Sequence, residues 1–448
     1  MIHTRLLALF GLLSCVGLGC GGSSPGPGET LNFLWDWTGI IGTGQSLSVG
    51  ALGGLVGNTP PSYNNMKIDF GGATIAPPFD PTIASLSVVP LTEPIRPGAT
   101  SYPSAYPVNI YGETPHSAMA TQITAMVMKA AAMHDYVTVH SIVGESGQQL
   151  DVIKKNPTNL PLEGTSGRAY DATLFEASAI TRLAGAATKT YGIGAIVLTH
   201  GEADAGNSNY ANEIYQFLTD YNTDLAAITG QTAKIPMFVS QQNSVPADAR
   251  SASISAVQVW KAGVDHPGEI VCTGPKYQYS YAVDPAHVHL NAHEYERLGE
   301  KYGQVYFERV VLGHDWQPLQ PVSAEINGKV IAVKFHVPVP PLTWDPNMPA
   351  HMTPEWTAGK GFEILAAGVA KTITDVQIVG DDTVNITCAD DLSGFQVTVG
   401  YATAADTGVV PADLPNRWGA LRDSDPFVGA VTASAQPNYC VAFQMIAQ

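Results

Sequence analysis

The sequence predicts an α/β domain with a mainly parallel sheet, followed by a smaller all-β domain. Across 31–314, apolar strand-like runs alternate with helix-like stretches, an order typical of a parallel sheet covered on both faces. After residue 314 the pattern changes to short β-rich runs separated by turns, without a helical pattern of any length. That pattern indicates a β-sandwich.

Four strands and four helices are expected in the α/β part of the chain. Strands are expected at 37–44, 136–144, 195–204 and 235–243, and helices at 117–134, 174–192, 210–230 and 292–310. Gly230 should end its helix, because glycine commonly follows the last helical residue. The Pro- and Gly-rich stretch 59–107 is expected to be a loop that walls a site.

The β-rich runs of the second part lie at 328–338, 372–380, 382–388, 395–402 and 439–445. Together these patterns divide the chain into a signal peptide of the lipoprotein type (1–20), a flexible tether (21–30), an α/β domain (31–318) and a β-sandwich (319–448).

The N-terminus indicates export. A single basic residue, Arg5, precedes an apolar run too short to span a membrane and small residues before Cys20. Cys20 is the predicted lipidation site because the flexible GGSSPGPG stretch follows it. Cys15 is the alternative, and a secretory signal without a lipid is the third. We expect a periplasmic, surface-anchored or secreted protein that meets membranes only through such an anchor.

The charge of the chain argues against one class of partner, and its cysteines allow a disulfide. The chain has 22 Lys and Arg against 39 Asp and Glu, a net charge of −17, and no basic cluster. A nucleic-acid partner is not expected, because neutralising phosphates requires a basic patch. Export permits a disulfide, and Cys388 with Cys440 is the candidate pair because both lie in the C-terminal part.

The glycine-rich segment GTGQSLSVG begins within the last three residues of the first expected strand and continues beyond it. A phosphate-binding loop would require a Lys and a Ser or Thr after its glycines, and the next basic residue is Lys67. A serine at a strand-to-helix turn can instead be a nucleophile if an imidazole accepts its proton. Ser46 occupies this turn, and Ser48 ranks lower because it lies further along.

Three blocks in order, GQS, HGEAD and D…HLNAHEY, resemble the SGNH hydrolase superfamily over about 35–310, especially its carbohydrate-esterase, sialate O-acetylesterase-like branch. The resemblance implies a flavodoxin-like three-layer α/β/α fold and ester hydrolysis through an acyl-enzyme, without a metal or other cofactor. By the same resemblance Ser46 matches the nucleophile and Asp284 the residue that orients the base. DxxH spacing selects His287 as the base, whereas the HLNAHEY context selects His289, which we prefer. His293 should lie inside the following helix.

The resemblance also implies donors for an oxyanion hole. These are the Ser46 N–H, Gly144 with Gly147 as competitor, and His200 in the place of the family's usual glutamine. Glu202 and Asp204 are expected to anchor loops.

Two other classes of function remain open. His200, Glu202, Asp204, Asp284, His287 and His289 include every ligand type that a Zn²⁺ or Mn²⁺ hydrolase would use. A non-catalytic glycan-binding lipoprotein could instead stack sugars on Trp344, Trp356, Tyr401 or Trp418 of the sandwich.

We predict a serine esterase that removes O-acetyl groups from a glycan, with a lipase or polyester-type esterase as the alternative. Activity should then fall as pH drops through an imidazole pKa, near 6–7 for an unperturbed ring. The substrate, the oligomeric state and the role of the sandwich stay open.

Overall fold

The structure is a computed structural model that describes residues 30–54, 63–72, 79–96, 112–131, 136–156, 168–244, 253–405 and 409–448. The predicted signal peptide, both candidate lipidation cysteines and all but the last residue of the tether lie outside these ranges. Among the described residues, no helix has the length and apolar character needed to cross a bilayer.

A seven-stranded sheet forms the centre of the N-terminal part, with strand order β3-β2-β4-β1-β5-β6-β7. All its neighbouring strands run parallel except β3, which is antiparallel to β2. The strands are β1 (Trp37–Gly44), β2 (Met66–Asp69), β3 (Ser87–Pro90), β4 (Val137–Gly144), β5 (Tyr191–Thr199), β6 (Met237–Gln241) and β7 (Ile270–Pro275).

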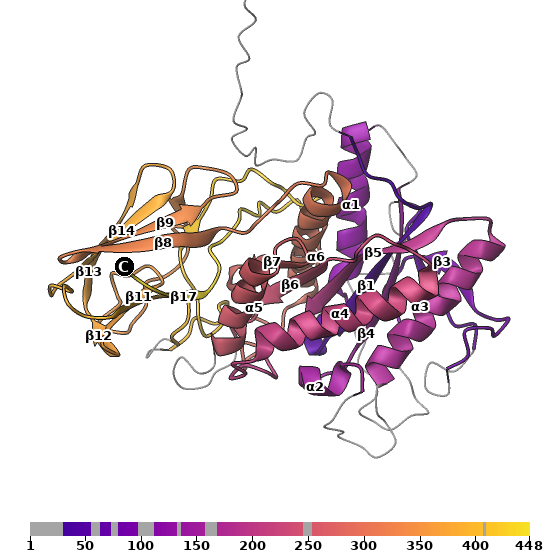
Figure 1. Cartoon of the computed structure of the whole chain (residues 1–448), viewed down its shortest axis with the longest axis horizontal. Coiled ribbons are helices and arrows are strands. Elements are labelled where there is room, and N and C mark those ends of the chain that lie inside the picture. The colour runs from indigo at the N-terminus through magenta and orange to yellow at the C-terminus, as the bar shows by residue number, and fades with distance from the viewer. Residues whose placement is uncertain are drawn as a thin grey trace, which may run out of the picture.

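Helices cover both faces of this sheet (Figure 1). Ile41 and Ile196 face a core shared with α3 and α4, whereas their neighbours Ile40 and Val197 face a core shared with α1 and α6. This alternation follows from the two-residue period of a strand. The helices are α1 (Pro115–Ala131), α2 (Leu150–Ile153), α3 (Arg168–Ala186), α4 (Tyr210–Thr229), α5 (Ile254–Asp265) and α6 (Ala292–Tyr306), which continues as η4 (Phe307–Val311).

The structure corrects the predicted elements at several places. The stretch 59–107, predicted to be a loop, contributes two strands in its described residues: β3 at the edge of the sheet and β2 between β3 and β4. Sequence analysis also missed α2, α5 and β7. Gly230 does end α4, in the left-handed conformation with φ 73°.

The C-terminal part contains two four-stranded antiparallel sheets, β13-β14-β9-β8 and β12-β11-β15-β17, and a short β10-β16 pair. The strands are β8 (Gln320–Asn327), β9 (Val330–His336), β10 (Thr343–Trp344), β11 (Phe362–Ala366), β12 (Val369–Lys371), β13 (Ile373–Val379), β14 (Thr383–Cys388), β15 (Val397–Tyr401), β16 (Leu421–Arg422) and β17 (Phe443–Ile446).

Aromatic rings join the two larger sheets. Phe335 of one sheet lies 6.3 Å from Phe362 and 6.2 Å from Phe443 of the other, between ring centroids. Tyr401 and Trp418 are buried, so neither presents a ring to a sugar. Trp344 and Trp356 are partly buried against the core, and Lys360 Nζ lies 4.3 Å from the Trp344 ring centroid.

The predicted Cys388–Cys440 disulfide is wrong. Cys272, Cys388 and Cys440 are buried free thiols. Cys388 ends β14 in one sheet, whereas Cys440 lies just before β17 of the other and accepts a hydrogen bond at its carbonyl from the hydroxyl of Tyr277 in the α/β part.

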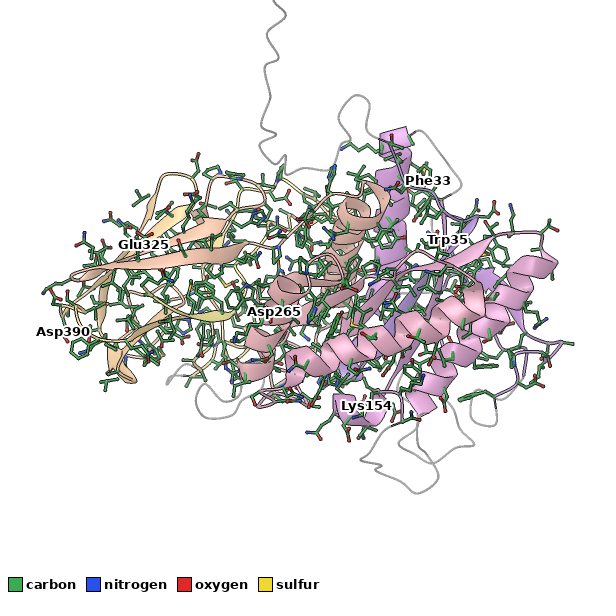
Figure 2. The ribbon with its side chains drawn as sticks, in the orientation of Figure 1. Phe33, Trp35, Lys154, Asp265, Glu325 and Asp390 are labelled. Atoms are coloured by element: carbon green, nitrogen blue, oxygen red, sulfur yellow. The ribbon has the colours of Figure 1, made fainter. Side chains whose placement is uncertain are left out.

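The two parts of the chain pack directly on each other beside α5 and α6 (Figure 1). The Gln241 side-chain amide donates to the Ala442 carbonyl and accepts from the Ala442 N–H, each over 2.8 Å. The Trp260 and Phe443 rings lie 5.9 Å apart. Figure 2 shows Glu325 and Asp390 at the end of the molecule away from Phe33, Trp35 and Lys154.

Candidate active site

Ser46 lies just beyond the carboxyl end of β1, where the chain turns sharply. Gly44 has φ 139°, and a Cβ there would lie 2.2 Å from the Thr199 carbonyl oxygen, so no side chain fits at the turn. The Gln45 N–H donates to the same carbonyl over 3.3 Å. Ser46 then opens the short 3-10 helix η1 (Ser46–Val49), and the residue is only 6% exposed.

His289 bridges Ser46 and Asp284. Its Nε2 lies 2.9 Å from Ser46 Oγ, and its Nδ1 lies 2.9 Å from Asp284 Oδ2. An ionised carboxylate can only accept, so the ring proton is on Nδ1 and Nε2 presents its lone pair to the serine hydroxyl. The Ser46 hydroxyl can therefore donate to His289, which is the arrangement that a serine nucleophile requires.

The environment of Asp284 keeps it ionised. Burial raises the pKa of its carboxyl, but four hydrogen bonds outweigh burial and hold the pKa below its ordinary value. The donors are the backbone N–H groups of Ala286, Val288 and His289, at 2.9, 3.2 and 2.9 Å, and the His289 ring. The Asp284 carboxylate thus bonds directly to His289, although the two residues are five positions apart in the sequence.

The other two histidines of this region lie elsewhere. The His287 Nδ1 donates to the Leu414 carbonyl over 2.6 Å, so the structure brings His289 and not His287 to the serine. His293 lies on α6 with its side chain 53% exposed, and its Nδ1 is 4.0 Å from Glu296.

Gly144 ends β4 in register with Gly44, at the same edge of the sheet as Ser46. A Cβ at Gly144 would lie 2.2 Å from Ser48 Oγ, so a side chain at this position would displace Ser48. The Ser48 hydroxyl donates to the Gln45 carbonyl over 2.7 Å and supports the turn. Gly147 lies in the turn after β4 with φ 71°. The role of Gly144 and of the Ser46 N–H as oxyanion donors stays a prediction.

The hydrogen bonds of His200 contradict its predicted role as an oxyanion-hole donor. Its ring is fully buried, and desolvation lowers its pKa despite the nearby Asp204 carboxylate, so it is neutral with a single N–H. Nε2 donates that proton to the Gln148 carbonyl over 2.9 Å, and Nδ1 accepts from the Tyr210 hydroxyl over 2.6 Å. With its one N–H used in this way, the His200 side chain has no proton to offer an oxyanion.

Glu202 and Asp204 do anchor loops, as predicted. Asp204 Oδ2 accepts from the Leu150 N–H over 2.7 Å. Glu202 forms a buried ion pair with Lys276 at 2.5 Å, which ties the loop after β5 to the end of β7. No sequence signal indicates Lys276, because its partner is distant in the chain.

Sequence analysis also missed the role of Gln45. Its side-chain oxygen accepts from the Ala203 N–H over 3.0 Å, which joins the GQS turn to the HGEAD loop. Its place beside the serine in the GQS block is the signal that could have found it.

Among the described residues, no group of three His, Cys, Asp or Glu side chains is arranged to hold a metal ion. The candidate ligands have other partners: His200 bonds Gln148 and Tyr210, Glu202 pairs with Lys276, and His287 bonds Leu414. The geometry therefore favours the serine arrangement over the metal alternative.

No family model and no curated protein matches this sequence. Solved structures do match. A carbohydrate acetylesterase from Xanthomonas citri superposes with a TM-score of 0.54 and 11% identity, over 91% of this chain and 80% of that chain. This chain shares the fold of that enzyme. At the level of fold, this agrees with the resemblance to the SGNH carbohydrate-esterase branch.

Two weaker likenesses each cover 60% of this chain. NanS matches at 12% identity over 60% of this chain and 96% of its own, with a TM-score of 0.39. A carbohydrate acetylesterase from Sinorhizobium meliloti, Est24, matches at 12% identity over 60% of this chain and 97% of its own, with a TM-score of 0.30.

Proposed function

We propose that this protein is a serine esterase that removes O-acetyl groups from a polysaccharide or other glycan. The observation that carries the proposal is the hydrogen-bonded series Asp284–His289–Ser46, with 2.9 Å between each pair of reacting atoms. We further propose that the α/β part, 31–318, is a flavodoxin-like three-layer hydrolase domain, that 319–448 is its sandwich, and that the signal peptide directs export and lipid anchoring.

In the proposed reaction His289 Nε2 takes the Ser46 proton as Oγ attacks the ester carbonyl. Asp284 fixes the ring tautomer and stabilises the imidazolium that forms. Collapse of the tetrahedral intermediate releases the sugar hydroxyl, which takes its proton from His289, and leaves acetyl-Ser46. Water, deprotonated by His289, then releases acetate. Each backbone donor to the oxyanion is worth roughly 3–4 kcal/mol when removed.

The acetylated-glycan substrate rests on two supports. The GQS, HGEAD and D…HLNAHEY blocks resemble the carbohydrate-esterase branch, and the fold is shared with an enzyme described as a carbohydrate acetylesterase. The triad geometry supports the ester-hydrolysis part of the proposal.

Steady-state hydrolysis of p-nitrophenyl acetate by the mature protein tests the chemistry. Ser46→Ala should lower kcat by at least about 10⁴-fold, because it removes the nucleophile. Unchanged turnover in Ser46→Ala, or loss of turnover to a chelator, would overturn the serine mechanism.

Acetate release from acetylated xylan, compared with hydrolysis of p-nitrophenyl esters of longer acids, tests the substrate. Release of acetate from the polymer supports the glycan esterase. A strong preference for long acyl chains would instead support the lipase or polyester-type alternative.

A further inference from the structure

The C-terminal part reaches the loop that carries Asp284 and His289. We call residues 411–417 the strap, and it lies against the catalytic loop, 281–289. The Tyr281 N–H donates to the Asp413 carbonyl over 3.1 Å, and the His287 Nδ1 donates to the Leu414 carbonyl over 2.6 Å. Consecutive carbonyls of the strap thus hold both ends of the turn that contains Asp284.

The strap is itself well fixed. Leu414 is 7% exposed and donates its N–H to the Pro411 carbonyl over 3.0 Å, closing a turn. Leu414 also precedes Pro415, and a residue before proline is restricted to extended conformations, which limits how far its carbonyl can reorient.

The other end of the strap is fastened to the carboxyl end of the central sheet. The Asn416 side-chain amide donates to the Ser244 carbonyl over 2.5 Å, and the Arg417 N–H donates to the Asn243 carbonyl over 3.1 Å. The Asn243 side chain accepts in turn from the Lys276 N–H at the end of β7, over 3.1 Å. The strap therefore links the catalytic loop to the same strand ends that carry the rest of the site.

A second contact of the C-terminal part holds the helix that follows the catalytic loop. α6 begins just after His289, at Ala292. Within α6 the buried Glu300 carboxylate accepts from the N–H groups of Val431 and Thr432, at 2.6 and 2.7 Å, and from the Gln436 side chain at 2.6 Å. The loop with the catalytic histidine is thus held before and after that residue.

We infer that the strap is a positioning element of the active site, and that His287 is the positioning residue through which it acts. This inference rests on the proposed serine mechanism. His287 sits two residues before His289 with φ 56°, at the point where the loop reverses. Its bond to Leu414 keeps the loop in the turn that brings His289 Nε2 to 2.9 Å from Ser46 Oγ. Displacing a reacting group by about 1 Å can cost roughly 10²-fold in rate.

Two substitutions of His287 separate positioning from folding. His287→Ala removes the donor, whereas His287→Asn keeps an N–H donor on a short side chain and tolerates the left-handed backbone. With p-nitrophenyl acetate, His287→Ala should lower kcat by roughly 10- to 100-fold while KM changes less than about twofold. His287→Asn should recover most of that loss.

The pH profile distinguishes a positioning residue from the base. His287→Ala should keep an acid limb in kcat/KM, because His289 still accepts the Ser46 proton. Disappearance of that limb in His287→Ala would overturn the assignment and make His287 the base.

Asn416→Ala loosens the strap without touching the catalytic loop, and it provides a double-mutant cycle. It should lower kcat roughly 3- to 10-fold, and the double variant with His287→Ala should be no slower than His287→Ala alone, because both changes release the same element. His293→Ala, an exposed position on α6, is the matched control and should equal the wild type.

Three further results would overturn the inference: wild-type kcat in His287→Ala, a change in KM alone, or losses that multiply in the double variant. If His287→Ala fails to fold, Asn416→Ala and His287→Asn decide by the same criteria. A wild-type protein without Ser46-dependent turnover would instead refute the proposed function, so the two failures are distinguishable.

Discussion

Asp284→Asn replaces a buried carboxylate by an amide of the same shape. Oδ2 accepts three hydrogen bonds, from the His289 ring and the N–H groups of Val288 and His289, whereas Oδ1 accepts one, from Ala286. The amide should therefore place its oxygen at the Oδ2 position and its NH₂ beside the Ala286 N–H. This orientation preserves the His289 tautomer, so the main change is the loss of a negative charge.

The size of that loss can be worked from the geometry. A charge 2.9 Å from Nδ1 stabilises the imidazolium by roughly 5–6 kcal/mol at an effective dielectric constant near 20. The His289 side chain is 23% exposed, so solvent screens part of this interaction. A loss of about 4 kcal/mol remains, which corresponds to roughly 10³-fold in kcat.

The assay is kcat for p-nitrophenyl acetate at pH 8, with the unfolding midpoint measured in parallel. Asp390→Asn is the matched control, because it makes the same charge change on an exposed side chain at the far end of the molecule (Figure 2). Its kcat should equal that of the wild type. A loss below tenfold in Asp284→Asn, with normal folding, would refute the reasoning.

Three other predictions concern the scaffold. Glu202→Gln leaves the buried Lys276 without its counter-charge and should cost about 3 kcal/mol of unfolding free energy in urea; a cost under 1 kcal/mol would contradict this. Gly144→Ala places a Cβ 2.2 Å from Ser48 Oγ and should destabilise by about 1–3 kcal/mol and slow turnover; an unchanged melting temperature and kcat would argue against the crowding. His116 and His140 are buried with their Nδ1 atoms 3.0 Å apart, and desolvation lowers the pKa of both, that of His116 to about 3. Below about pH 6.5 the unfolded chain therefore binds more protons than the folded chain does. The free energy of unfolding should decrease as the pH is lowered, by about 1.4 kcal/mol per pH unit for each ring. Urea titrations of the wild type and His116→Gln between pH 7 and 5 measure this, and equal slopes would show that His116 takes no part.

The sequence could predict the alternating α/β elements because buried strands and amphipathic helices each leave their own periodicity. It placed Ser46, Asp284 and His289 because those side chains stand in recognisable blocks at strand and helix ends. The strands β2 and β3 were missed because they are short and lie in a Pro- and Gly-rich stretch.

Contacts between distant segments left no comparable signal. The strap reaches the catalytic loop mainly through the backbone carbonyls of Asp413 and Leu414, which any side chain would supply. His200 was assigned wrongly because its partners, a Gln148 carbonyl and the Tyr210 hydroxyl, become neighbours only in the folded chain.

Covalent labelling of Ser46 tests the central claim most directly. A dialkyl p-nitrophenyl phosphate should transfer its phosphoryl group to Ser46 Oγ and release p-nitrophenol, as His289 takes the serine proton. Peptide mass spectrometry should find one adduct per chain, on Ser46, with labelling slowed at least about 10³-fold in His289→Ala. Esterase activity that survives the reagent while Ser46 stays unmodified would contradict the account.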